Sequence, residues 1–207
     1  VEEGARVTSL DRHPEALARL AGEIDGIETR VLDVTSAAEV DAALDAIAER
    51  EGRIDVGVNN AGISRGLAWL HEAAETDWDA VVGVNLKGVW LCMRAELRHM
   101  YAQGAGVIVN TASIAAYEGQ VGQPAYAASK GGVVGLTLPA ARQLARAGVR
   151  VVTIAPGLFH TPMVDGLPPE VQASLGAGIP FPARLGRPSE YAELVEHIVR
   201  NRFLNGE

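Results

Sequence analysis

The chain has little cysteine, few aromatic residues and no cluster of positive charge. Its single cysteine, Cys92, excludes an internal disulfide and a cysteine-based metal site, and the five histidines show no metal-ligand spacing. With 18 basic against 26 acidic residues, for a net charge of −8, it lacks the electrostatic footprint of a nucleic-acid-binding protein. No apolar run approaches the roughly 20 residues of a membrane span, and nothing resembles a signal peptide. We expect no metal, no nucleic acid and no membrane among its partners, and a cytoplasmic location.

What remains fits an ordinary soluble protein of one domain. Hydrophobic residues make up 48% of the 207 and charged residues 21%, which is the usual balance for a globular chain. This length supports one substantial core and makes two domains improbable. We find no internal repeat and no interdomain linker, so residues 1–207 are interpreted as a single domain.

Short apolar runs alternate with segments of helical periodicity. Strands are predicted over residues 6–11, 29–34, 54–58, 107–111 and 150–154. One long helical stretch runs from about 76 to 102 with a bend near Gly83 and Gly88, and Ser36 with Glu39 forms a capping box before another helix. Strands alternating with helices indicate an α/β fold with a doubly wound parallel sheet. Residues 158–188, rich in proline and glycine, break this rhythm and predict a substrate loop with short helical pieces.

Tyr126 and Lys130 form the most informative pair in the sequence. Four residues apart on a predicted helix, they share one face. An ammonium beside a phenol favours the phenolate, so the tyrosine can serve as an acid or base near neutrality. Ser113 ends an apolar run and could reach the same point from a neighbouring strand. The three residues predict a site that moves a proton on or off a carbonyl oxygen.

Unusual residues recur where predicted strands end. Doubly wound parallel sheets bind ligands outside the carboxyl ends of their strands, and these ends carry Asp11, Asp33-Val34, Asn59-Asn-Ala-Gly62, Ser113 and Pro156-Gly157. An acid at such an end accepts hydrogen bonds from ribose hydroxyls and repels a 2′-phosphate, so Asp11 favours NAD over NADP. Taken alone, Asp11 is better explained as a turn residue, and the adjacent Arg12 slightly weakens the preference for NAD.

The chain resembles the short-chain dehydrogenase/reductase family over essentially its whole length. The resemblance rests on Asn59-Asn-Ala-Gly62, Asn85, Ser113, Tyr126-x-x-x-Lys130 and Pro156-Gly157, in that order. Segments 119–123, 153–159 and 180–186 are similar to the subgroup of type 2 3-hydroxyacyl-CoA dehydrogenases. The resemblance implies a Rossmann-like fold and an NAD-dependent oxidoreductase that interconverts a 3-hydroxyacyl-CoA and a 3-ketoacyl-CoA. A hydroxysteroid dehydrogenase, a 3-ketoacyl-carrier-protein reductase, and an inactive fragment or scaffold that keeps the fold are the alternatives.

The resemblance also implies residue roles. Tyr126 would be the general acid in ketone reduction and the base in alcohol oxidation, with Lys130 favouring its phenolate and holding the nicotinamide ribose. Asn85 would hold a water that passes protons to Lys130. Ser113 would hydrogen-bond the substrate oxygen, with Gln123 and Phe159 as further substrate contacts. Cofactor contacts would come from Asp11, Asp33, Val34, Asn59, Ala61, Gly62, Tyr126, Lys130, Pro156, Gly157 and Thr161.

Each of these residues also has a purely structural interpretation. Tyr-x-x-x-Lys occurs by chance on many surface helices, and Ser113 could simply cap the turn after its strand. Asn85 could be a buried amide with satisfied hydrogen bonds, and Gly62 and Gly157 could be turn glycines. Only their joint occurrence in the family's order favours the catalytic interpretation.

The sequence departs from the family pattern at both ends. A family member opens with a strand and a glycine-rich turn, Thr-Gly-x-x-x-Gly-x-Gly, which is absent here. We expect an internal part of a longer dehydrogenase, with Val1-Glu-Glu-Gly4 closing a helix and with the first and last strands missing. The first two predicted strands would then be separated from the third, with interior edges exposed. These residues alone should bind NAD weakly or not at all. The resemblance also implies that the full-length protein forms a homotetramer through helices near 76–102 and 123–145.

Overall fold

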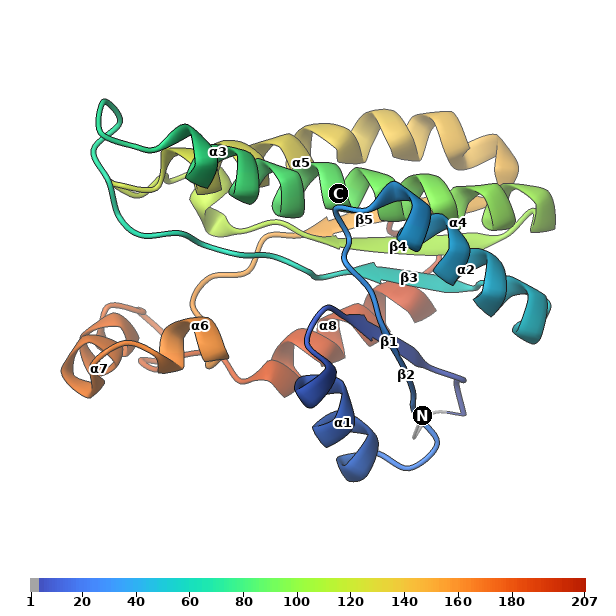
Figure 1. Ribbon diagram of the computed structural model, residues 1–207, viewed down its shortest axis with the longest axis horizontal. Helices are drawn as coiled ribbons and strands as arrows, with labels where there is room; N and C mark the ends of the chain where they lie inside the picture. The colour runs from blue at the N-terminus through green and yellow to red at the C-terminus, as the bar shows by residue number, and fades with distance from the viewer. Residues whose placement is uncertain (1–3) are drawn as a thin grey trace.

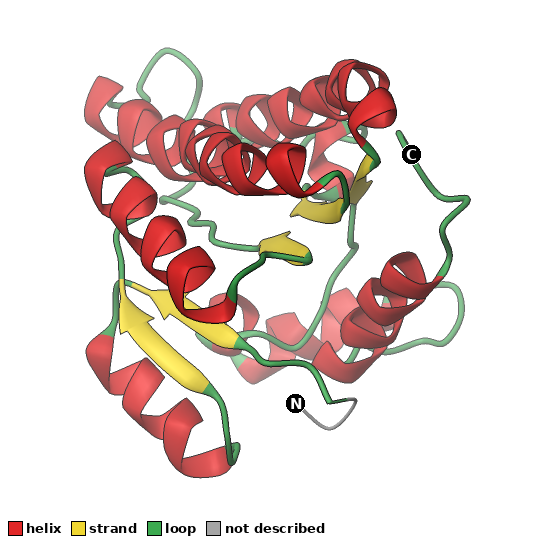
Figure 2. Cartoon of the chain, turned by 90° about the vertical axis from the view of Figure 1, so that its right-hand side faces the viewer, coloured by secondary structure: helices red, strands yellow, loops and turns green. Residues whose placement is uncertain are grey.

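Parallel strands form two separate sheets in the computed structural model, which describes residues 4–207 (Figure 1). β1 (Thr8–Asp11) pairs with β2 (Glu28–Val31). The other sheet has the order β3-β4-β5, from Val56–Asn59, Gly106–Thr111 and Val149–Ile154. The predicted parallel α/β fold is confirmed, as is the separation of the first two strands from the third, which Figure 2 shows. The helix end predicted at Val1–Gly4 falls almost wholly outside the described residues.

The three-stranded sheet carries the core on both faces. Ile108 and Val151 belong to a buried cluster shared with α2 (Ala37–Glu51), α4 (Val89–Gln103) and α5 (Pro124–Leu144). Their strand neighbours Val109 and Val152 point to the other face and pack with Ile198 of α8 (Pro188–Arg200). Continuous apolar runs suit strands that helices cover on both sides. Figure 1 shows α4 and α5 above this sheet and α8 below it.

The predicted helix over 76–102 is interrupted where the two glycines led us to expect a bend. α3 (Glu75–Val82) leads into a π-helical segment, η1 (Gly83–Gly88), and α4 follows. A π-helical segment inserts extra residues into the helical path and is often found at functional sites. Asn85 lies in the middle of it and is completely buried.

The helix that follows β2 begins as predicted but with half of the expected cap. Ser36 Oγ accepts a hydrogen bond from Glu39 N at 3.4 Å. The Glu39 carboxylate does not return to Ser36; it accepts from Asp33 N at 3.1 Å and so holds the turn before the helix. α1 (Pro14–Glu23) opens with proline at its first position, which suits that residue because the missing N–H has no helical partner there.

The segment predicted to hold the substrate loop contains two short helices, α6 (Pro162–Asp165) and α7 (Pro169–Ala177). Two single turns, η2 (Ile114–Ala116) and η3 (Ala145–Ala147), complete the described elements. Residues at the C-terminal end run beside β5: Gly206 N donates to Val151 O at 2.8 Å, and Thr153 N donates to Glu207 O at 2.9 Å. These bonds pair backbone groups of β5, whose only partner strand among the described residues is β4. Among the described helices, none combines the length and apolar character that crossing a bilayer requires.

Candidate active site

Tyr126 and Lys130 meet near the start of α5. Lys130 Nζ lies 5.8 Å from the centroid of the Tyr126 ring, which confirms the predicted shared face. Lys130 is almost fully buried, and this burial lowers its pKa to about 8. Its ammonium donates to the carbonyl oxygen of Thr111, at the end of β4, at 2.7 Å. Since an ammonium has three N–H groups, others remain available to donate hydrogen bonds to a ligand.

Asn85 ties the π-helical segment to the loop after β3 and to α5. Its Oδ1 accepts from Ile63 N at 2.8 Å, and its Nδ2 donates to Ile63 O at 2.9 Å and to Ser129 Oγ at 3.2 Å. Ser129 Oγ in turn donates to the carbonyl oxygen of Tyr126 at 2.7 Å. Asn85 therefore fits the satisfied-amide interpretation and at the same time orients the helical turn that carries Tyr126.

The turn Asn59–Gly62 passes directly beside Lys130. A Cβ atom at Gly62 would lie 3.4 Å from Lys130 Nζ and 3.5 Å from Asn85 Oδ1. Asn60 Oδ1 accepts a hydrogen bond from Thr111 Oγ1 at 3.1 Å, which joins this turn to the end of β4. Turn geometry is therefore not the sole explanation for a glycine at position 62, since the absence of a side chain also leaves space next to the buried ammonium.

Ser113 follows β4 and opens η2. Its Oγ accepts a hydrogen bond from Ala115 N at 3.2 Å, so Ser113 does cap the turn after its strand. That bond uses a lone pair and not the O–H, which remains able to donate to a ligand. Ile114 N donates to Pro156 O at 3.0 Å, and η2 lies against α5. The structure thus brings the Ser113 segment beside the helix of Tyr126 and beside the end of β5.

The side chain of Asn59 points away from this surface. It is buried and donates to Glu96 Oε2 at 3.2 Å and to Asn110 Oδ1 at 3.1 Å. A contact between Asn59 and a cofactor would therefore come from its backbone. Burial raises the pKa of the Glu96 carboxyl to about 7.

Sequence reasoning did not single out Glu96, Ser129 or Thr111. For Glu96 a signal existed, because it lies four residues after Cys92 and four before Met100 on a stripe that is buried throughout. For Ser129 the signal was its place in the Tyr126–Lys130 segment, one helical turn from Tyr126. Thr111 acts on Lys130 through a backbone carbonyl, and a side-chain pattern does not reveal such a role.

The carboxylates proposed for the adenosine half of the cofactor both act locally. Asp11 Oδ1 accepts from the backbone N–H two residues on at 2.8 Å, as its turn interpretation predicts. Asp33 Oδ1 accepts from Thr35 N and Thr35 Oγ1, each at 2.8 Å, and these bonds lower the pKa of Asp33. Val34 packs against Gly88, where a Cβ would lie 2.8 Å from Val34 Cγ2. Asp11 ends β1, and Asp33 and Val34 follow the carboxyl end of β2.

Of the predicted site residues after β5, some are open to a ligand and one, Phe159, is packed against another helix. Pro156 and Gly157 follow the strand after one intervening residue, and no atom lies within 4 Å of the Cβ position of Gly157. Thr161 precedes α6 as its N-cap. Phe159 instead packs on Tyr191 of α8, with the two ring planes nearly perpendicular (88°) and their centroids 6.3 Å apart. A substrate contact from Phe159 would therefore come from the part of its ring that is not packed against Tyr191.

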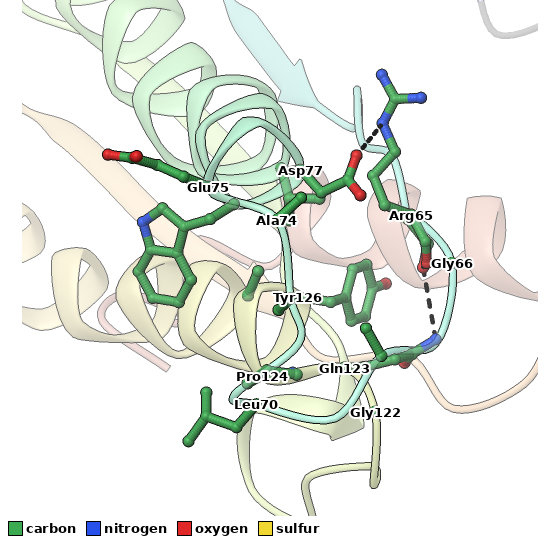
Figure 3. A pocket seen from close by; sticks show the side chains of 16 residues that line it. Arg65, Gly66, Leu70, Ala74, Glu75, Asp77, Gly122, Gln123, Pro124 and Tyr126 are labelled. Carbon is green, nitrogen blue, oxygen red and sulfur yellow. Dashed lines mark hydrogen bonds and ion pairs between the residues drawn. The ribbon is translucent and has the colours of Figure 1, made fainter.

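A cavity of about 270 Å³ opens beside Tyr126 (Figure 3). It is lined by the loop after β3, the start of α3 and the start of α5. Gln123, a predicted substrate contact, lines it and donates from Nε2 to Ser64 Oγ at 3.4 Å. Figure 3 shows Tyr126 between the segment of Arg65 and the start of α3, with the Arg65–Asp77 ion pair (3.8 Å) at one side. Across residues 4–207, no cluster of three or more His, Cys, Asp or Glu side chains is suited to a metal ion.

Comparison with known proteins gives a consistent result. The family model described as short chain dehydrogenase matches residues 1–172. The chain is 52% identical to a rat (Rattus norvegicus) 3-hydroxyacyl-CoA dehydrogenase type-2, over 84% of this chain and 71% of that one. It is 40% identical to a 3-oxoacyl-[acyl-carrier-protein] reductase of Thermotoga maritima, over 94% and 80%. The crystal structure of a 3-ketoacyl-(acyl-carrier-protein) reductase from Brucella melitensis, complexed with NADH, superimposes with a TM-score of 0.92 at 32% identity, covering 99% and 85%.

Proposed function

The chain belongs to the short-chain dehydrogenase family, and on this basis we propose that it interconverts a 3-hydroxyacyl-CoA and a 3-ketoacyl-CoA with NAD(H). The observation that carries the chemistry is the buried Lys130 ammonium, 5.8 Å from the Tyr126 ring. The substrate is supported by the similarity to the rat 3-hydroxyacyl-CoA dehydrogenase type-2. A cavity that contains Tyr126 gives the reacting carbon a place to lie.

The residues around Lys130 fit a dinucleotide. Gly62 leaves a space beside the ammonium that a side chain would fill, and Lys130 keeps donors for ribose hydroxyls. Backbone of the Asn59–Gly62 turn borders this space, and we assign Pro156, Gly157 and Thr161 to the nicotinamide end. Asp11, Asp33 and Val34 are assigned to the adenosine half. When bound, NAD(H) supplies or accepts the hydride, and the protein manages the proton.

In the reducing direction, Tyr126 donates its phenolic proton to the oxygen of the substrate ketone as negative charge develops there. Lys130 stabilises the phenolate that remains, because its ammonium lies close to the ring in a dry environment. Ser113 donates its free O–H to the same oxygen and stabilises the developing charge. In the oxidising direction each transfer is reversed, and the Tyr126 phenolate takes the proton of the alcohol.

We assign to Asn85 the task of holding a water that returns protons to Lys130. Asn85 Oδ1 and Lys130 Nζ both lie within 3.5 Å of the Cβ position of Gly62, so a water near this point could contact both groups. Asn85 Oδ1 uses one lone pair for Ile63 N and has a second one available.

A comparison of substrates tests the proposed function. The full-length protein is purified and mixed with NADH and with acetoacetyl-CoA, a ketosteroid or an acetoacetyl-carrier protein, and the loss of NADH absorbance is followed. We expect the highest kcat/KM with acetoacetyl-CoA and a clear preference for NADH over NADPH. Turnover of the steroid alone, or NADH binding without turnover of any ketone, would contradict the proposal.

A second candidate is a 3-ketoacyl-carrier-protein reductase. It is favoured by the superposition over 99% of this chain and by the 40% identity to the Thermotoga maritima protein. The same assay separates the two functions, because a reductase of this kind would prefer the carrier-bound ketone to its CoA ester.

A homotetramer remains our proposal for the assembly of the full-length protein. Trp90 on α4 and Leu138 on α5 are 46% and 43% exposed, on the two helices for which the resemblance implies subunit contacts. Light scattering coupled to size-exclusion chromatography tests this, and a monomer at assay concentrations would overturn it.

A further inference from the structure

Large apolar side chains gather on two loops at the edge of the Tyr126 cavity. Leu67, Trp69, Leu70 and Val121 are 72%, 64%, 75% and 80% exposed. We refer to these four residues as the apolar lip. Single exposed hydrophobic residues are common on protein surfaces, but a group of them beside a cavity indicates a binding surface.

Specific contacts hold the two loops together. Ala68 N donates to Gly122 O at 3.1 Å, and Gln123 Nε2 bonds Ser64 Oγ on the same side. Gly122 has a φ of +84°, a conformation that favours glycine, and a Cβ there would lie 3.1 Å from Leu67 Cβ. Two segments more than 50 residues apart in sequence are therefore held close together by specific contacts.

The lip is continuous with the cavity. Ala68, Leu70 and Gly122 line the cavity together with Tyr126, and Leu67, Trp69 and Val121 are their direct neighbours in sequence. In Figure 3, Leu70 and Gly122 lie on the same side of the cavity, below Tyr126. Leu70 therefore belongs to both the cavity wall and the lip, and Leu67 lies against Gly122, which also lines the cavity.

The size of the cavity shows that a substrate must extend beyond it. Its volume of about 270 Å³ is near the lower limit of roughly 300 Å³ for pockets that enclose a small ligand. A ketone group and a few carbons fit there, but an entire acyl-CoA does not. Of the two ends of an acyl-CoA, the CoA portion is polar and charged, whereas the acyl chain is apolar and matches the lip.

We propose that the apolar lip binds the acyl chain of the substrate beyond the carbons held in the cavity, so that the enzyme favours longer chains over short ones. This inference rests on the proposed function, because its occupant is the chain of a 3-ketoacyl-CoA. Each methylene that the lip removes from water strengthens binding by up to about fourfold. Because the lip is exposed, substitutions within it should leave folding intact.

The test is the dependence of KM on chain length. The full-length wild-type protein and its Trp69→Ser and Val121→Ser variants are assayed with NADH and with acetoacetyl-CoA, 3-ketooctanoyl-CoA and 3-ketohexadecanoyl-CoA. We expect the ratio of the KM for the longest chain to the KM for acetoacetyl-CoA to rise about tenfold in each variant. Phe203→Ser is the matched control, because Phe203 is 95% exposed but lies outside both loops. It should leave the ratio unchanged, and thermal melting checks that all variants fold.

Three results would overturn the inference. If the ratio in both lip variants equals that of the wild type, the lip does not bind the chain, while the proposed function stands. If the variants change the oligomeric state and leave the ratio unaltered, the lip is a contact between copies of the chain. If the wild type turns over no 3-ketoacyl-CoA of any length, the proposed function fails and the inference fails with it.

Discussion

Lys130 combines a positive charge with an almost fully buried position. Burial lowers its pKa to about 8, so it is an ammonium at neutral pH and loses its charge at mildly alkaline pH. Its one hydrogen bond to the Thr111 carbonyl does not neutralise it. The residue on which the proposed mechanism most depends is therefore also one that titrates close to physiological conditions.

A pH profile tests this role of Lys130. As pH rises through about 8, the ammonium is lost and the phenolate of Tyr126 loses its stabilising partner. We predict that kcat/KM for ketone reduction falls above this pH, because kcat/KM reports groups of the free enzyme. In Lys130→Met the rate should be low at every pH, without the alkaline decline. A wild-type profile that stays flat to pH values well above 8, or a decline that persists in Lys130→Met, would argue against this role.

Glu96 presents the opposite case, an acid that is buried away from the reacting groups. Its carboxyl faces Gly57 on β3, where a Cβ would overlap it, and it accepts one hydrogen bond from Asn59. Cys92 lies one turn earlier on the same helix, and its pKa is raised to about 12 mainly by burial and further by Glu96. Asp41 and Asp45 of α2 form ion pairs with basic residues of α4, namely Arg94 and Arg98.

Glu96 makes stability dependent on pH. Burial raises its pKa from 4.5 to about 7, so the folded state holds a proton that the unfolded state releases. Its contribution is fully present below pH 4.5, declines as pH rises to about 7 and is constant above that. We predict that Glu96→Gln, which keeps an acceptor for Asn59, gains up to about 3 kcal/mol over the wild type between these limits.

Urea denaturation at acidic and at neutral pH measures this gain. The matched control is Glu49→Gln on the exposed face of α2, which should not change the pH dependence. If Glu96→Gln and the wild type respond to pH in parallel, the carboxyl is not protonated in the folded protein.

At the scale of elements, two helix ends meet at a pair of glycines. Gly104 ends α4 with a φ of +70°, and Gly148 ends η3 with a φ of +69°. A Cβ at Gly148 would overlap the carbonyl oxygen of Gly104. This contact fixes how α4 and the segment after α5 enter their strands, since β4 and β5 begin within two residues of these glycines.

We predict that Gly148→Ala lowers the free energy of unfolding by about 2 kcal/mol or more, from left-handed backbone strain and from the clash. Gly135→Ala provides the control, because Gly135 lies in the middle of α5 with open space around its Cβ position. It should raise the free energy of unfolding by up to about 1 kcal/mol through helix propensity. Chemical denaturation of both variants gives the comparison, and equal effects would show that the close approach is not rigid.

Much of this arrangement could be predicted from the sequence, and the exceptions have physical causes. Strand positions and the Tyr126–Lys130 face followed from periodicity, because the core selects apolar residues at regular spacing. The break at Gly83 and Gly88 was predicted as a bend, but its π-helical form was not, since it depends on Asn85 finding Ile63 and Ser129 in three dimensions. The buried direction of Asn59 likewise depends on Glu96, which lies 37 residues away.

Across the whole molecule, the two sheets differ in how well they are covered. β4 lies between β3 and β5 and is buried from Val107 to Thr111. The β1–β2 pair is mostly half-buried or exposed, and α1 contributes a single buried residue, Leu17. Two-stranded sheets are weak on their own. Stability should therefore be concentrated in the β3–β4–β5 unit and its helices.

Hydrogen exchange measures this difference directly. We predict that the amides of β4 exchange slowest, through global unfolding, and that those of β1 and β2 exchange through local opening at rates that are at least about tenfold faster. Protection in β1 and β2 equal to that in β4 would mean that the molecule unfolds as one cooperative unit.

The central claim is that Tyr126 transfers the proton in a hydride-transfer reaction, and Tyr126→Phe tests it most directly. The substitution removes one hydroxyl and keeps the ring that lies over Lys130. We predict that, in the full-length protein, NADH-dependent reduction of acetoacetyl-CoA falls by about a thousandfold, whereas the Kd for NADH, measured by fluorescence titration, changes less than about twofold. Turnover that stays within tenfold of the wild type, with NADH binding intact, would contradict the claim.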